Sequence, residues 1–314
     1  RTSFKKKMLE AEQMYANTKD KKYEKLARKY YIVQHSKKIS LNSAYGAIGN
    51  KYFRYYDHRQ AEAITMSGQL NIKWIEKKLN EYFNKLYNTD DDYIIASDTD
   101  SVYINMAPLV KMTGATDKDK IVKALDTFCS EQLEPYIAKV YKELGDYMNV
   151  RENKMVMKRE AIADRGIWTA KKRYILNVHN SEGVQYPEPK LKIMGIEAVK
   201  TSTPLPCRDK LKECFKILMN GDEKEMKEFC VNFRREFELL PPEDIGFPRS
   251  VNNVEKYSDT TSIYKKGTPM HVKGALLYNH LLKTKKVSHK HQTIYEGDKG
   301  KFVHLRKNPW NANV

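Results

Sequence analysis

Apolar residues recur along much of the chain at the spacing of an amphipathic helix. Between residues 61 and 87 they lie three or four positions apart, which places Ile75, Leu79 and Phe83 on one face. The same periodicity predicts helices over residues 1–16, 22–45, 61–87, 121–148, 208–219 and 223–239. The turn signal at residues 17–20 (NTKD) joins the first two helices tightly, so they are expected to pack as an antiparallel hairpin. Gly46 and Gly49 are expected to end the second helix.

Shorter apolar segments predict strands. Residues 93–96 (YIIA) and 102–104 (VYI) flank the polar segment SDTDS, a pattern typical of strand, tight turn and strand. Further strands are expected at 155–161, 168–178 and 190–199, and the remainder beyond Ser250 is expected to be irregular. This mixture of helices with antiparallel strands predicts an α+β fold with a subdomain boundary near Thr203.

Asp98 and Asp100 lie within the polar segment SDTDS. Side chains at i and i+2 of an extended segment point the same way, so the two carboxylates are expected to project together from the tip of a hairpin. Two like charges held this close favour a cation between them, and Mg²⁺ binds one or two carboxylates together with phosphates and water. Taken alone, a solvated Asp-rich turn explains the segment about as well.

The chain of 314 residues has a formal net charge of +17, from 57 Lys and Arg against 40 Asp and Glu. A basic excess of this size favours a polyanionic partner, although some basic proteins bind no nucleic acid. The four cysteines have no zinc-site spacing and are expected to be reduced thiols of an intracellular protein. No stretch of about 18 apolar residues is present, so no membrane partner is expected.

A polar face is predicted on the second helix. Lys38, Asn42 and Tyr45 are spaced i, i+4 and i+7, and Arg1 and Lys5 are spaced i and i+4 on the opposing helix. Several cations and an amide that converge in this way suit a triphosphate, whose oxygens must be held at several points. The alternative is a charged face that is exposed to solvent.

Three segments resemble, in the same order, the motifs of family B DNA polymerases. Residues 38–46 (KISLNSAYG) resemble the KxxxNSxYG element, residues 98–101 (DTDS) the catalytic hairpin, and residues 172–174 (KRY) the KxY element. The resemblance is to the T4-like bacteriophage subgroup, which residues 53–57 (FRYYD), 192–195 (KIMG), 202–204 (STP) and 271–274 (HVKG) also echo. DTDS alone is a weak signal, but the ordered set is specific.

The resemblance implies a role for each matching residue. Asp98 and Asp100 would be catalytic carboxylates that bind two Mg²⁺ ions, and Glu160 resembles an acidic residue near that metal site. The nucleotide-binding residues that it implies are Arg1, Lys5, Lys38, Asn42 and Tyr45. The DNA-binding residues that it implies are Gly46, Lys172 and Tyr174.

The implied architecture is that of a right-hand polymerase, with helical-hairpin fingers (1–50), an antiparallel-sheet palm (51–203) and a largely helical thumb (204–314). The implied activity is template-directed DNA synthesis on primer-template DNA from deoxynucleoside triphosphates, in the cytoplasm of an infected host cell. A sliding clamp is a further candidate partner, although Asn313-Val314 shows no obvious clamp-binding peptide.

The family's Asp-x-x-Ser-Leu-Tyr-Pro element, which carries another metal-binding Asp, is not found in these residues. The chain is therefore expected to be the C-terminal portion of a polymerase, with that segment upstream in the same polypeptide or on a separate one. The alternative is a non-catalytic DNA-binding module derived from a polymerase, for which Asp98 and Asp100 would be dispensable.

Overall fold

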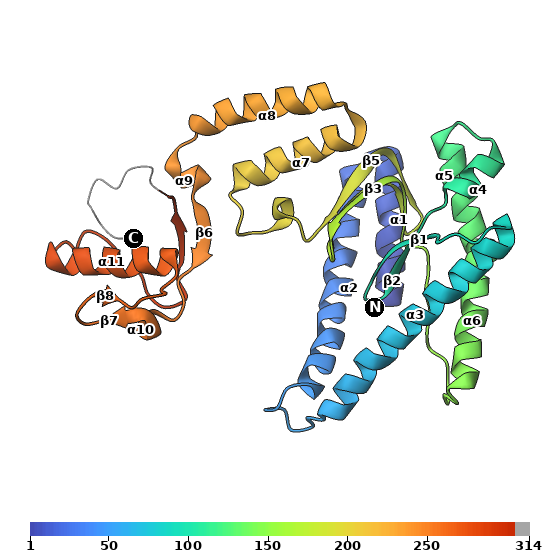
Figure 1. The fold of residues 1–314 in the computed structure, drawn as a ribbon, viewed down its shortest axis with the longest axis horizontal. Coiled ribbons are helices and arrows are strands. Elements are labelled where there is room, and N and C mark those ends of the chain that lie inside the picture. Colours follow the sequence, from blue (N-terminus) through green and yellow to red (C-terminus); the bar gives the residue numbers. More distant parts are fainter. Residues whose placement is uncertain (305–314) are drawn as a thin grey trace. The chain divides into compact units, whose positions relative to one another are not determined.

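The computed structural model describes residues 1–304 of the chain (Figure 1). These residues form two compact units that are interleaved in sequence. The first unit contains residues 1–167 and 176–192, and the second contains residues 168–175 and those from 193 onward. The expected clamp-binding position at Asn313-Val314 lies outside the described residues. None of the helices within residues 1–304 is long and apolar enough to cross a membrane.

The first unit begins with the predicted helical hairpin, formed by α1 (Thr2–Thr18) and α2 (Lys21–Ile48) (Figure 1). Lys19 adopts the left-handed conformation that ends α1, and the side chain of Asp20 accepts a hydrogen bond from the Lys22 amide to begin α2. The expected end of α2 at Gly46 is wrong, because the helix continues to Ile48 and Gly49 follows it. Gly46 therefore lies within a helical turn.

The core of the first unit forms where α3 (His58–Tyr87) packs against a long, interrupted helix. That helix consists of α5 (Lys118–Phe128), one π-helical turn at Cys129–Leu133 and α6 (Glu134–Tyr147), so the element predicted over 121–148 is present but underwound at its centre. The short helix α4 (Ala107–Thr113) was not predicted. The buried side chains of this core are Ile75, Leu79, Phe83, Tyr93, Cys129, Leu133, Ile137, Val140 and Tyr141.

Two of the sheets carry the candidate site residues. Strands β1 (Ile94–Asp98) and β2 (Ser101–Ile104) form the predicted hairpin, and β3 (Ala161–Ala170), β4 (Arg173–Ser181) and β5 (Val184–Met194) form a three-stranded sheet in that order. The strand expected at 155–161 is wrong, because regular structure begins only at Ala161. The strand expected at 168–178 is wrong as a single element, because Lys172 takes a positive φ of 61° and the chain reverses there.

The second unit contains the predicted helix pair, α7 (Leu205–Asn220) and α8 (Glu223–Glu238). The short helix α9 (Pro242–Ile245) follows, and β6 (Phe247–Ser250) pairs with β9 (Lys299–Phe302). The expectation of irregular structure past Ser250 is wrong. That region contains α10 (Val254–Tyr257), the paired strands β7 (Ser258–Asp259) and β8 (Ile263–Tyr264), and α11 (Met270–Thr284).

Helix α11 buries Val272, Ala275 and Leu276 against Val251, which gives the second unit a core of its own. Helices and antiparallel strands together make the described chain an α+β structure, as predicted.

Candidate functional site

The carboxylate hairpin closes through a two-residue connection. Asp98 is the last residue of β1 and pairs with Ser101, and Thr99 and Asp100 lie between them. Thr99 has a positive φ of 57°, the Asp100 amide donates to the carbonyl of Asp98 at 2.7 Å, and the Ser101 hydroxyl donates to the same carbonyl at 3.1 Å. These bonds fix the backbone on both sides of the two aspartates. The tight turn that the sequence predicted is confirmed.

The two carboxylates differ in exposure, since Asp98 is half-buried and Asp100 is exposed. The Thr99 hydroxyl donates to Asp98 Oδ1 at 3.0 Å. Because the left-handed Thr99 separates the two residues, the alternation of side chains along a strand does not apply across this turn. Burial, and to a smaller extent the charge of Asp100, raise the pKa of Tyr141 in the neighbouring core. The strands on both sides of the turn pack against that core through Ile94, Val102 and Ile104.

The donor set of this hairpin fits Mg²⁺, which prefers carboxylate oxygens and takes only one or two of them besides phosphates and water. Within residues 1–304 no group of three or more His, Cys, Asp or Glu side chains is arranged to hold a metal ion. Glu160 is ion-paired with Lys192 at 2.7 Å. Metal binding by Asp98 and Asp100, and a role for Glu160 beside them, stay predictions.

The residues of the polar face predicted on α2 lie in its last three turns, where every residue from 35 to 46 is exposed. The side chains of Lys38, Asn42 and Tyr45 are exposed, and the neighbouring Lys37 Nζ lies 5.9 Å from the centre of the Phe4 ring. This contact shows that the first turn of α1, next to Arg1, lies beside the end of α2 that carries the polar face. Arg1 is exposed as well. The structure thus places four of the five expected nucleotide-binding residues on open surface of one helical hairpin.

Lys5 is the exception among these residues. Its Nζ atom lies 2.5 Å from Glu182 Oε1, and the two side chains are only 35% and 26% exposed. Glu182 lies in the turn between β4 and β5. The ammonium group is therefore engaged by a carboxylate that is 177 residues away in sequence.

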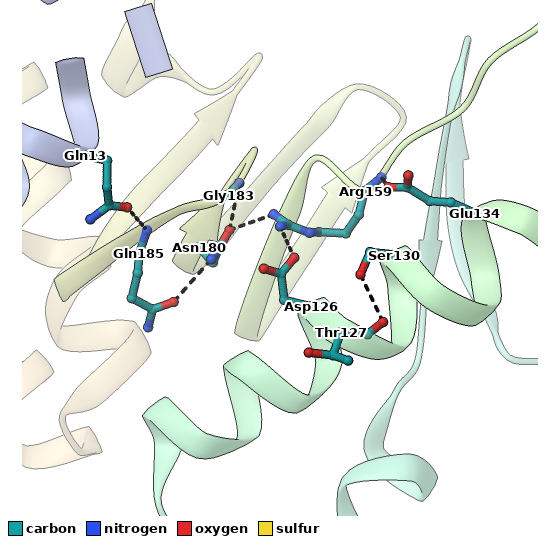
Figure 2. Close-up of polar contacts among 9 residues, drawn as sticks. All are labelled: Gln13, Asp126, Thr127, Ser130, Glu134, Arg159, Asn180, Gly183 and Gln185. Carbon is teal, nitrogen blue, oxygen red and sulfur yellow. Dashed lines mark hydrogen bonds and ion pairs between the residues drawn. The ribbon is translucent and has the colours of Figure 1, made fainter. Parts of the chain in front are cut away.

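A polar network around Arg159 is a feature that the sequence did not indicate (Figure 2). The guanidinium of Arg159 pairs with Asp126 of α5 and donates from Nη1 to Asn180 Oδ1 of β4 at 2.6 Å. The Arg159 amide donates to Glu134 Oε1 at 3.0 Å. The segment that precedes Glu160 has no regular structure, so these bonds hold it in place.

The same network reaches the helical hairpin (Figure 2). Asn180 Nδ2 donates to Gln185 Oε1 at 3.2 Å, and the Gln185 amide donates to Gln13 Oε1 of α1 at 3.0 Å. Hydrogen bonds thus run from α5 through the sheet to α1. The helix that carries Arg1 and Lys5 is held at a defined position on the β4–β5 turn.

Lys172 and Tyr174 belong to the second unit. Lys172 is exposed in the turn before β4, and its carbonyl oxygen would lie 2.1 Å from a Cβ atom at Gly195, whose φ is +66°. Tyr174 is buried, with its ring stacked at 6.3 Å from that of Trp168. Gly46, in contrast, is exposed, with no atom within 4 Å of the position a Cβ would take. DNA contact by these three residues stays a prediction.

The known proteins that are similar to this chain belong to one class. No protein-family model matches the chain. The DNA-directed DNA polymerase of Enterobacteria phage T4 is 39% identical over 290 residues, which is 88% of this chain and 32% of that protein. The DNA-directed DNA polymerase of Escherichia phage RB69 is 39% identical over 262 residues, which is 80% of this chain and 29% of that protein. DNA polymerase 1 of Saccharolobus solfataricus is 26% identical over 252 residues, 79% of this chain and 23% of that protein.

The chain is thus related in sequence to DNA polymerases of phages and archaea. It belongs to the family of T4-like phage DNA polymerases. The chain spans about a third of the length of the phage relatives that it matches.

Proposed function

We propose that this chain carries part of the polymerising machinery of a DNA-directed DNA polymerase, which adds deoxynucleoside triphosphates to a primer 3′-hydroxyl by two-metal phosphoryl transfer. The observation that carries the proposal is that the ordered motifs lie in a chain 39% identical over 290 residues to a protein of that name. The carboxylate hairpin and the polar helical hairpin also belong to one compact unit.

Phosphoryl transfer requires alignment and charge neutralisation more than covalent chemistry by the protein. Asp98 and Asp100 would hold Mg²⁺, which when bound lowers the pKa of the attacking hydroxyl and offsets charge on the leaving group. Arg1, Lys5, Lys38 and Asn42 would hold the triphosphate from the helical hairpin. Tyr45, exposed on the same face, would pack beside the nascent base pair.

Primer-template DNA is the proposed polymeric partner. The net charge of +17 favours contact with phosphates. The segment between α2 and α3 adds exposed aromatic rings beside cations, with Lys51 Nζ 5.0 Å from the ring centre of Tyr52 and the guanidinium of Arg54 5.5 Å from that of Tyr55. Exposed rings next to cations suit the stacking of unpaired bases. Gly46, Lys172 and Tyr174 are the other proposed DNA contacts.

The proposed division into fingers (1–50), palm (51–203) and thumb (204–314) follows the order of the motifs. A further metal-binding carboxylate is proposed to come from sequence outside these 314 residues, in the same polypeptide or a separate one. The proposed setting is the cytoplasm of an infected host cell, with a sliding clamp as an additional candidate partner.

Primer extension with Mg²⁺ and all four deoxynucleotides tests the proposal. The chain alone, the complete protein that contains it and the complete protein with Asp98→Ala are compared. Extension by the complete protein that Asp98→Ala abolishes is the expected result. Extension that survives Asp98→Ala overturns the metal assignment. DNA binding without extension in the complete protein would identify a non-catalytic module.

A further inference from the structure

The ion pair between Lys5 and Glu182 joins the proposed triphosphate site to the β4–β5 turn. Lys5 Nζ lies 2.5 Å from Glu182 Oε1, a charge-assisted contact between two partly buried side chains. Glu182 has a positive φ of 50°, and its amide donates to the carbonyl of Glu160 at 2.7 Å. The backbone of Glu182 is therefore held independently of its side chain, and the carboxylate is presented to Lys5.

A second contact lies two helical turns further along the same helix. Gln13 Oε1 accepts a hydrogen bond from the Gln185 amide at 3.0 Å. Residues 5 and 13 are eight positions apart, which places them about 80° apart around the axis, within one side of α1. Between them, burial raises the pKa of Glu12, Lys190 lowers it, and the charge of Glu182 adds to the rise. Two residues on this side of α1, Lys5 and Gln13, thus contact the β4–β5 hairpin.

A phosphate group and the Glu182 carboxylate are both anions that seek the same ammonium group. They repel each other, so the ammonium does not bind both at full strength. We propose that Glu182 is a positioning residue that holds Lys5 while the triphosphate site is empty, and that an incoming polyphosphate must displace its carboxylate. The inference deepens the proposed function and depends on its assignment of Lys5 to the triphosphate.

Binding of inorganic tripolyphosphate to the purified 314-residue chain, measured by isothermal titration calorimetry at fixed ionic strength, tests this proposal without polymerase activity. Glu182→Gln removes the competing charge and is expected to tighten binding about two- to fivefold, the range set by a modest surface ion pair. Lys5→Gln is expected to weaken binding. Adding Glu182→Gln to Lys5→Gln is expected to change nothing further, because the two side chains act through one contact.

The matched control is Glu188→Gln, which removes the same charge from an exposed position on β5 of the same hairpin. Its binding constant is expected to equal that of the unmodified chain. Glu182→Asp provides a second variant that keeps the charge but withdraws the carboxylate by one methylene, and a smaller tightening is expected. A structural defect would weaken binding, so a gain in affinity separates the proposed role from a loss of folding.

The proposal is overturned if Glu182→Gln and Glu182→Asp bind tripolyphosphate no more tightly than the unmodified chain. Undetectable binding by all three proteins also overturns it. It is also overturned if Glu188→Gln tightens binding as much, or if the effect of Glu182→Gln persists without Lys5. Primer extension by the complete protein decides the proposed function separately. Absence of extension together with tighter binding by Glu182→Gln would overturn the polymerase activity and leave the role of Glu182 standing.

Discussion

Arg159 Nη1 donates a hydrogen bond to Asn180 Oδ1 at 2.6 Å, and this bond ties the irregular segment before β3 to the C-terminal end of β4 (Figure 2). The same guanidinium pairs with Asp126 of α5, and the Arg159 side chain is only 12% exposed. One largely buried side chain therefore connects a helix, a strand and the backbone that leads to Glu160. Its removal takes the guanidinium away from Asp126 and leaves Asn180 Oδ1 with the Gly183 amide, at 3.1 Å, as its remaining donor.

Arg159→Met is expected to lower the free energy of unfolding by about 2–4 kcal/mol, because Asn180 and the partly exposed Asp126 lose their charged donor. Urea unfolding followed by circular dichroism measures the change. Arg151→Met, at an exposed position, is the matched control and is expected to stay within about 0.5 kcal/mol of the unmodified chain. Equal stabilities for the two variants would contradict the importance of the network.

Gly195→Ala is expected to destabilise the second unit by more than about 2 kcal/mol. A Cβ at this position would lie 2.1 Å from the carbonyl oxygen of Lys172, and the φ of +66° disfavours any L side chain. Gly274→Ala is the control, since no atom lies within 4 Å of its Cβ position in the interior of α11. It is expected to stabilise by about 0.5–1 kcal/mol. Thermal unfolding of both variants distinguishes the expected loss of stability from the expected gain. An unchanged stability in Gly195→Ala would contradict the close approach of the Lys172 carbonyl oxygen to residue 195.

Asp164 gives the first unit a specific acid sensitivity. Burial would raise the pKa of its carboxyl, but hydrogen bonds from Asn177 at 2.8 Å and Lys118 at 3.2 Å, with His179 Nε2 at 3.2 Å, hold the pKa below its ordinary value of 3.8. A carboxyl with a lowered folded-state pKa stabilises the fold fully above the unfolded value. That contribution is lost as the pH falls below 3.8 towards the folded-state value.

Asp164→Asn is therefore expected to reduce stability at pH 6, and the difference from the unmodified chain is expected to shrink as the pH is lowered from about 4 to about 3. Urea unfolding across this pH range measures the difference. Asp90→Asn, in an exposed loop, is expected to produce no such pH-dependent difference. A constant gap between Asp164→Asn and the unmodified chain would mean that the carboxylate charge is not responsible.

Local signals in the sequence predicted much of the fold. The α1–α2 and α7–α8 pairs were predicted because their periodicity and turn residues act over a few positions. The strand expected across 168–178 failed, because Lys172 takes a left-handed conformation that its residue type does not signal. Helix α11 was missed although most of its residues are apolar, because Gly274 interrupts them and the surrounding sequence is rich in Lys, His and Tyr.

The sequence predicted only those features of the candidate site that depend on residues close to one another in the chain. The turn between Asp98 and Ser101 depends on adjacent residues, so its closure was predicted correctly. The partners of Lys5 and Arg159 come from distant elements, and nothing in the composition around either residue indicates which acid or amide it meets. Resemblance supplied the expected role for Lys5, and only the structure supplied the competing carboxylate.

Asp98→Asn provides a direct test of the carboxylate hairpin in the complete protein. The amide keeps an oxygen that can accept the Thr99 hydroxyl bond but removes the charge that a metal ion requires. Primer extension with Mg²⁺ is expected to fall by at least about 100-fold, the loss that follows removal of one group that stabilises transition-state charge. The free energy of unfolding is expected to stay within about 0.5 kcal/mol of that of the unmodified protein, because the turn is held by backbone bonds.

Asp90→Asn is the control, because it removes a charge from the exposed loop that precedes β1 and should leave extension unchanged. Equal activity in Asp98→Asn and Asp90→Asn would exclude Asp98 from the reaction.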